Sequence, residues 1–281
     1  MRLGGAFRSS GEPAHEPGTS LTSHWFDRRT LDRIRERYGE YPVADVSYAT
    51  VADFVDSFEN LNQLACAQGD LKDVQRPWVL KTVLSTVPRG GRILEIGGGQ
   101  PYVADLLARL GYEVWLVDPY DGSGNGPVEF EAYRTMCPSV RFVRSVFDDR
   151  LSDPPRGEFD CVLSISVLEH IDHDGLNGVF RGLAKFLTPN GVSIHAIDHV
   201  HRGRADREHL ERLRFITLRS GLSTAKLDMI LSQMESDTET YCLSAESHNR
   251  WRGSLPYEEF PMRICVGIQL VSRATDLQVI T

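Results

Sequence analysis

The stretch Arg92–Tyr102, RILEIGGGQPY, decides the fold. An apolar run over residues 92–96 ends in three consecutive glycines, and the apolar residues after them recur at helical spacing. This order predicts a strand, a tight turn and a helix. Glycine adopts backbone conformations that other residues avoid, and it lets a ligand approach the main chain closely. Because the next helix adds unpaired N–H groups and the positive end of its dipole, the turn predicts a nucleotide-like ligand.

The glycine pattern distinguishes between kinds of nucleotide. A dinucleotide turn has the form G-x-G-x-x-G, but Tyr102 stands at the third position, where its bulk would obstruct a pyrophosphate. Glu95 favours a ligand that carries positive charge and no phosphate. The run L-E-I-G-G-G-Q-P resembles the first motif of the class I S-adenosylmethionine-dependent methyltransferases. The resemblance implies that the following residues contact this cofactor: Glu95, Gly97, Gly98, Gly99 and Pro101, the last of which also suits a first helical position.

Four later stretches resemble further motifs of the same family, in the expected order. Asp118 ends the second predicted strand, where an acid accepts both ribose hydroxyl groups. The family usually holds the adenine amino group with an acid after the third strand, so we expect Asp148 there, with Asp149 as the second choice. V-L-E-H-I (167–171) resembles the fourth motif, and L-T-P-N-G resembles the turn before the fifth strand. The resemblance therefore adds these cofactor contacts: Asp118, Pro119, Phe147, Asp148, Ser164 and Ser166.

Strands and helices alternate from Arg92 onward, which predicts a mostly parallel sheet covered by helices on both faces. We expect strands at 92–96, 112–117, 140–145, 159–165, 192–198, 239–244 and 262–272, the last two as a hairpin with an antiparallel edge. We expect helices at 24–40, 47–66, 74–87, 127–136, 174–187 and 206–220, with a turn at 188–191. The fold class is α/β, a doubly wound, mostly parallel seven-stranded sheet of the Rossmann-like methyltransferase type with an N-terminal helical cap. The predicted boundaries are a disordered tail at 1–20, the cap at 21–88 and the methyltransferase domain at 89–281.

The bulk composition narrows the class of protein. The 281 residues carry a net charge of −8, with 41% hydrophobic and 25% charged residues, as in ordinary globular proteins. An acidic balance argues against a nucleic-acid partner or an anionic membrane surface, since both attract basic patches. The sequence lacks an apolar run of membrane-spanning length and the apolar core of a signal peptide. We therefore expect a cytoplasmic protein with reduced thiols, no membrane partner, and a homodimer as an open option.

Histidines gather in the second half of the chain, and most of the nine lie between residues 170 and 209. Methyl transfer needs a nucleophile in line with the sulfonium methyl group, and a hydroxyl acceptor benefits from a general base. Histidine titrates near neutrality and suits that role. We expect His170 or His199 to be the base, with Asp198 beside them at the end of the fifth strand. The expected reaction is methyl transfer to a hydroxyl oxygen of a small polar metabolite, a sugar or a natural product.

Other chemistries remain open at this point. In ubiquinone-pathway O-methyltransferases and small-RNA 2′-O-methyltransferases the motif E-x-x-E-H ligates magnesium, but Ser166 replaces its first glutamate here. Glu169, His170 and His199 are possible ligands of a divalent metal, although we favour a site without one. N- or C-methylation, aminopropyl transfer of the polyamine synthase type and cofactor binding without catalysis are the alternatives. The polar, aromatic stretch 247–261 is a candidate loop over the substrate.

Overall fold

The computed structural model describes residues 27–65, 69–123, 126–152, 157–203, 205–244 and 264–278. These residues form one seven-stranded sheet of order β1-β7-β6-β5-β2-β3-β4. Strands β2 to β6 are parallel to one another, and β7 is antiparallel to both β6 and β1. The predicted fold class, a mostly parallel α/β sheet of seven strands, is confirmed. No helix within the described ranges combines the length and the apolar character needed to cross a bilayer.

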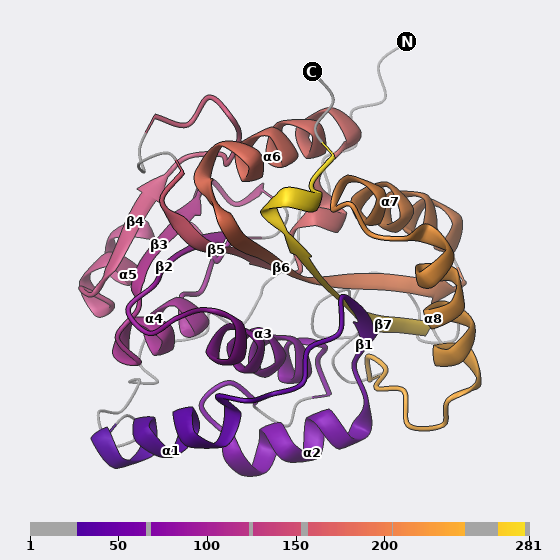
Figure 1. The fold of residues 1–281 in the computed structure, drawn as a ribbon, viewed down its shortest axis with the longest axis horizontal. Coiled ribbons are helices and arrows are strands. Elements are labelled where there is room, and N and C mark those ends of the chain that lie inside the picture. Colours follow the sequence, from indigo (N-terminus) through magenta and orange to yellow (C-terminus); the bar gives the residue numbers. More distant parts are fainter. Residues whose placement is uncertain are drawn as a thin grey trace.

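Helices cover both faces of the sheet (Figure 1). The strands are β1 (Val46–Tyr48), β2 (Arg92–Ile96), β3 (Glu113–Asp118), β4 (Val140–Arg144), β5 (Phe159–Ile165), β6 (Leu187–Arg202) and β7 (Ile264–Arg273). The helices are α1 (Arg28–Tyr38), α2 (Val51–Asn60), α3 (Lys72–Thr86), α4 (Tyr102–Arg109), α5 (Phe130–Met136), α6 (His173–Phe186), α7 (Asp206–Arg219) and α8 (Thr224–Ser236), with short 3-10 helices η3 (Leu168–His170) and η5 (Ala274–Asp276).

The core consists of two main apolar layers. On one side, α3 and α4 pack against the sheet through residues such as Val79, Leu106 and Leu163. On the other side, α6, α7 and α8 pack against it through a second buried cluster that includes Phe180 and Ile216. Figure 1 shows α1 and α2 outside α3, farther from the sheet. The candidate site lies at the carboxyl ends of the parallel strands, which is where doubly wound sheets bind their ligands.

The seventh strand was predicted in the wrong place. Residues 239–244 make only isolated antiparallel bridges, Thr50 to Thr240 and Cys242 to Val266. The seventh strand is instead β1, in a segment predicted as the start of a helix over 47–66. Pairing with β7 holds β1 extended, and a capping box between Thr50 and Asp53 starts α2 only at Val51. The predicted helix therefore mixed a strand with a helix.

Two further differences lie in the second half of the chain. Helix α8 was not predicted; Ser223 caps it by accepting the Lys226 N–H at 3.2 Å. The predicted turn at 188–191 lies inside the bounds of β6, where the pairing with β5 shifts register. Strand β6 also extends beyond residue 198, because β7 pairs with it as far as Arg202. The boundaries predicted for the tail, the cap and the catalytic domain stay predictions.

Candidate active site

The glycine turn between β2 and α4 is closely packed. Gly97 and Gly99 have φ values of 62° and 48°, a region that side chains rarely adopt. A Cβ atom on Gly97 would lie 2.8 Å from both methyl groups of Val167, and one on Gly98 would lie 2.7 Å from Leu116 Cδ1. The loop after β5 thus meets the turn through Val167. The packing accepts only glycine at residues 97 and 98, so the turn presents bare main chain to a ligand.

Asp118 ties the end of β3 to this turn. Its Oδ2 accepts the Gly99 N–H at 3.1 Å, and its Oδ1 accepts the Tyr120 N–H at 2.7 Å. Tyr120 has a strained φ of 48°, and its hydroxyl donates to the Gly99 carbonyl at 2.9 Å. Burial raises the pKa of Asp118 above its usual value. Each carboxylate oxygen keeps a lone pair for a further donor, so Asp118 can still accept a ribose hydroxyl.

Glu95 lies directly beneath the turn, where a Cβ on Gly98 would be 3.0 Å from its Cδ. Its side chain is 3% exposed, and burial raises its pKa to about 7. Its Oε2 is buried without a hydrogen-bond donor from the described residues. A buried oxygen of this kind calls for a donor or a positive charge. The charge of Arg76 in α3 is the largest influence that lowers the Glu95 pKa against this burial.

These groups fit the cofactor that the sequence predicts. The glycine turn lets a ligand approach its main chain closely, and Asp118 can accept hydrogen bonds from hydroxyl groups of the ligand. The buried Glu95 oxygen favours a cationic group beside it. A sulfonium nucleoside that carries an amino acid offers all three partners. Fold and site together define an α/β enzyme that binds a nucleoside at the carboxyl end of its sheet.

A second cluster lies at the ends of β5 and β6. Gln75 of α3 donates from Nε2 to Asp198 Oδ1 at 2.8 Å, and Ser166 Oγ lies 2.8 Å from Gln75 Oε1 and 2.9 Å from Asp198 Oδ1. Ser166 has a strained φ of 54°. No described residue donates to Asp198 Oδ2. Since Val167 touches the glycine turn, this cluster borders the cofactor site.

Glu169 supports the same cluster through the main chain of Asp198. Its Oε1 accepts the Asp198 N–H at 2.7 Å, and its Oε2 is buried without a donor from the described part of the chain. Burial, and after it the charge of Asp198, raises the pKa of Glu169 well above its usual value. This favours the protonated acid. Glu169 therefore supports the main chain at Asp198 through its Oε1.

The predicted histidines do not come together. Asp198 faces α3, so its strand neighbour His199 faces the opposite side of the sheet. His201, in phase with His199, lies 3.6 Å from Glu235 of α8. His199 is 1% exposed, and burial lowers its pKa to about 3. This placement argues against His199 as a base in the crevice, whereas His170 is exposed on η3, which follows β5.

The remaining predicted contacts occupy different environments. Ser164 is buried on the α6 side, with Oγ 2.8 Å from Nδ1 of His195. Phe147 packs in the core against Phe186, with ring centroids 5.7 Å apart. Asp148 pairs with Arg150, whose Nε donates at 2.8 Å and whose hydrogen bonds lower the Asp148 pKa. Pro101 is buried at the start of α4, Pro119 is half-buried after Asp118, and Asp149 pairs with Arg181 at 3.1 Å.

The possible metal ligands are also separated. Glu169 is buried, His170 is exposed, and His199 faces the other side of the sheet. In the ranges that the structure describes, no group of three or more His, Cys, Asp or Glu side chains is arranged to hold a metal ion. The candidate substrate loop at 247–261 lies outside the described residues.

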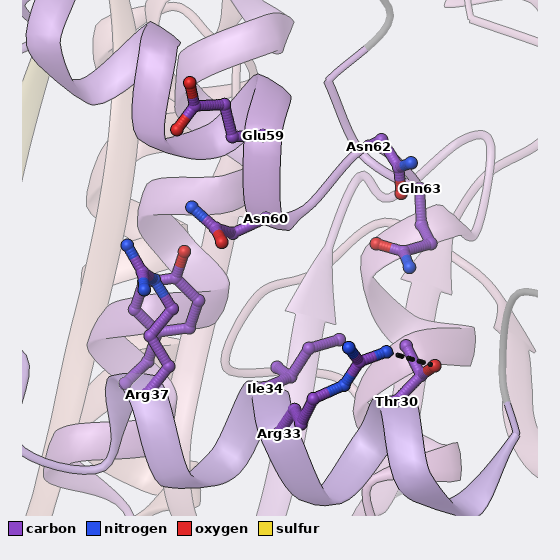
Figure 2. Close-up of a pocket in the computed structure, with 9 residues that line it drawn as sticks. Thr30, Arg33, Ile34, Arg37, Glu59, Asn60, Asn62 and Gln63 are labelled. Atoms are coloured by element: carbon purple, nitrogen blue, oxygen red, sulfur yellow. Dashed lines mark hydrogen bonds between the residues drawn. The ribbon is translucent and has the colours of Figure 1, made fainter.

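A separate hollow of about 410 Å³ lies between α1, α2 and residues 62–63 (Figure 2). Arg33, Arg37 and Asn60 line it, and Arg33 points across its floor towards Thr30. Arg37 pairs with Asp56 of α2 at 2.8 Å. None of the predicted site residues lies in this hollow.

Sequence reasoning missed Gln75, the residue that joins α3 to both Ser166 and Asp198. The one available signal was its position: Gln75 is a neutral polar residue within V-Q-R-P-W-V-L, a segment that is otherwise mostly apolar. Its 0% exposure and its two partners come from the tertiary fold. A buried amide in an apolar helix is a reason to look for a polar partner.

Comparison with known proteins identifies the family. A family model described as "Methyltransferase domain" matches residues 70–259. The chain belongs to this family, and it is a class I S-adenosylmethionine-dependent methyltransferase. The predicted family, enzyme class and cofactor are thereby confirmed.

Several individual proteins are also similar to the chain. The protein-L-isoaspartate O-methyltransferase of Dechloromonas aromatica is 26% identical over 218 residues, which covers 73% of this chain and 98% of that protein. The solved phosphoethanolamine N-methyltransferase 2 of Haemonchus contortus is 18% identical, with a TM-score of 0.44 over 80% of this chain and 60% of that one. A putative sarcosine dimethylglycine methyltransferase from Galdieria sulphuraria is 15% identical, with a TM-score of 0.46 over 72% of this chain and 85% of that one.

Proposed function

We propose that this enzyme methylates a hydroxyl oxygen of a small polar metabolite, such as a sugar or a natural product, and that Asp198 receives the hydroxyl proton. S-adenosylmethionine supplies an electrophilic methyl group when bound. The observation that carries the proposal is the state of Asp198, whose Oδ1 is held by Gln75 while no described residue donates to Oδ2. A carboxylate held through one oxygen, whose second oxygen accepts no hydrogen bond from a described residue, suits a hydroxyl acceptor.

The surroundings of Asp198 support this role. Ser166 and Gln75 orient its carboxylate, and the Glu169 carboxyl holds the main-chain N–H of the same residue. A carboxylate that is held through one oxygen and through its main chain loses little conformational freedom when its other oxygen accepts a proton. His170, exposed on η3 after β5, is the second candidate for the base. The proposal needs no metal ion.

The curated relatives suggest a second candidate, since they are named as O-methyltransferases of protein L-isoaspartate. Isoaspartate offers a carboxylate as its acceptor oxygen. A carboxylate acceptor would lie close to the Asp198 carboxylate at the ends of β5 and β6, in a chain whose net charge is −8. Like charges repel, so we favour a neutral hydroxyl over an anionic acceptor.

The acceptor can be found by incubating metabolite extracts with the enzyme and isotope-labelled S-adenosylmethionine, and then identifying the labelled product. We expect a methyl ether. With that acceptor, Asp198→Asn should lower kcat about 10²- to 10⁴-fold and leave the affinity for S-adenosylhomocysteine within about twofold. His199→Ala serves as the matched control on the same strand, and its kcat should fall far less. Full activity of Asp198→Asn would refute the proposal, as would a labelled isoaspartyl peptide as the only product.

A further inference from the structure

The loop after β5 carries two of the side chains that contact Asp198. Glu169 accepts the Asp198 N–H at 2.7 Å, and Ser166 Oγ lies 2.9 Å from Asp198 Oδ1. The main chain of this loop is irregular, because Ser166 has a φ of 54° and residues 168–170 form only the short 3-10 helix η3. The geometry around Asp198 therefore depends on what holds this loop in place.

Arg212 of α7 contacts the loop at Glu169. Its Nη1 donates a hydrogen bond to the main-chain carbonyl of Glu169, and α7 packs against η3. The main-chain hydrogen bonds of η3 end on the carbonyls of Val167 and Leu168. The Glu169 carbonyl is the next one along the chain, so Arg212 supplies it with a donor from a different helix.

Among the described residues, the Glu169 carbonyl is the one acceptor that Arg212 meets, and no carboxylate pairs with it. Arg214, two residues later, has such a partner in Asp228 at 2.8 Å. Arg212 is nevertheless half-buried, and its Nε is buried without an acceptor from the described part of the chain. Removing a guanidinium from water without an ion pair is costly. What this placement gives in return is a charge-assisted hydrogen bond that fixes the main chain of the loop.

We propose that Arg212 is a positioning residue for methyl transfer, and that it fixes the loop after β5 that holds Asp198. The inference rests on the proposed function, in which Asp198 receives the hydroxyl proton. Arg212 acts through the loop, so its loss should lower turnover and leave cofactor binding nearly intact. Helix α7 then takes part in the acceptor half of the site, although it covers the face of the sheet opposite α3.

The first measurement needs no acceptor. Hydrogen exchange of the Asp198 amide, followed by NMR on the full chain with S-adenosylhomocysteine bound, reports the hydrogen bond to Glu169 directly. Arg212→Met keeps the apolar stem and removes the donors, so this amide should exchange about 10- to 100-fold faster, while amides in β2 and β3 keep their rates. Arg212→Lys should recover part of the protection, because it restores a charged donor without the fork. Unchanged exchange at Asp198, or equal acceleration in all strands, would overturn the inference.

Kinetics with the identified acceptor give the second measurement. Arg212→Met should lower kcat about 10- to 100-fold, with the acceptor KM and the S-adenosylhomocysteine affinity within about threefold. Retained S-adenosylhomocysteine binding shows that the variant is folded. Arg214→Met is the control, because Arg214 is exposed on the same helix and pairs with Asp228, and its kcat should stay unchanged.

A double variant tests whether Arg212 acts through the loop. Added to Glu169→Ala, Arg212→Met should lower kcat far less than it does alone, since both changes release the same loop. Fully multiplicative losses would contradict the inference. Full activity of Asp198→Asn would overturn the proposed function, and the inference with it. Lost activity in Asp198→Asn, together with normal Asp198 exchange in Arg212→Met, would overturn the inference alone.

Discussion

The two halves of the site are built differently. At the ends of β2 and β3, the Asp118 carboxylate accepts hydrogen bonds from the main-chain N–H groups of Gly99 and Tyr120. At the ends of β5 and β6, side chains bind one another, and Asp198 meets Gln75 from a distant helix. The first half depends on a short sequence pattern. The second half depends on tertiary contacts between three segments of the chain, namely α3, the loop after β5, and β6. We therefore expect substitutions in the first half to affect cofactor binding, and those in the second to affect turnover.

The largest effect should come from Gly97→Val. Its side chain would overlap Val167 and force a β-branched residue into a φ of 62°. Overpacking and left-handed strain together cost about 4 kcal/mol in the original turn geometry. Because the free turn relaxes away from this geometry and ligand binding has to restore it, S-adenosylhomocysteine affinity should fall near a thousand-fold in calorimetry. Gly90→Val is the matched control, because Gly90 also has a positive φ but no atom near its Cβ position. Unchanged binding by Gly97→Val would remove the turn from the site.

Glu95→Gln should change how the stability of the fold depends on pH. Because burial raises the Glu95 pKa to about 7, the folded chain holds this proton more tightly than the unfolded chain does. Ionisation therefore destabilises the fold increasingly from about pH 4.5, and the full effect is reached above pH 7. The variant should gain on the order of 3 kcal/mol in the free energy of unfolding at pH 8 and little at pH 5, measured in urea. An equal gain at both pH values would show that Glu95 does not titrate there.

Asp118→Asn should weaken S-adenosylhomocysteine binding about tenfold, since an amide keeps one acceptor but loses the charge that strengthens bonds to the ribose hydroxyls. The exposed Asp121 provides the control, because it follows in the same loop and accepts the Ser123 N–H. Asp121→Asn should bind like the unmodified enzyme. Equal affinities for the two variants would argue against Asp118 as the ribose acid.

The smallest effect on the cofactor should come from His199→Ala. His199 is buried on the face of β6 that α7 covers, so removing its ring leaves a cavity on the side of the sheet away from α3. Unfolding should become easier by about 1–3 kcal/mol, while S-adenosylhomocysteine affinity stays within about twofold. A large loss of affinity without a loss of stability would place His199 at the crevice after all.

The contrast between the halves also explains what the sequence predicted. Strands β2 and β5 have the predicted bounds, because each is a buried apolar run that ends sharply. Strand β1 was missed since three residues carry almost no periodic signal, and its extended form depends on pairing with β7. The contact between Gln75 and Asp198 joins residues that are far apart in the chain, so no local sequence pattern predicts it. Strand alternation alone places Asp198 and His199 on opposite faces of the sheet, whereas the crowding of histidines along the sequence carries no information on which face each one takes.

The most direct test is a crystal structure of the enzyme with S-adenosylhomocysteine bound. The nucleoside should lie across the turn at residues 97–99, with its ribose hydroxyls on Asp118 and its sulfur directed towards the loop that holds Ser166. A nucleoside bound elsewhere, for example in the hollow between α1 and α2, or a turn filled by side chains in the presence of saturating ligand, would contradict the account.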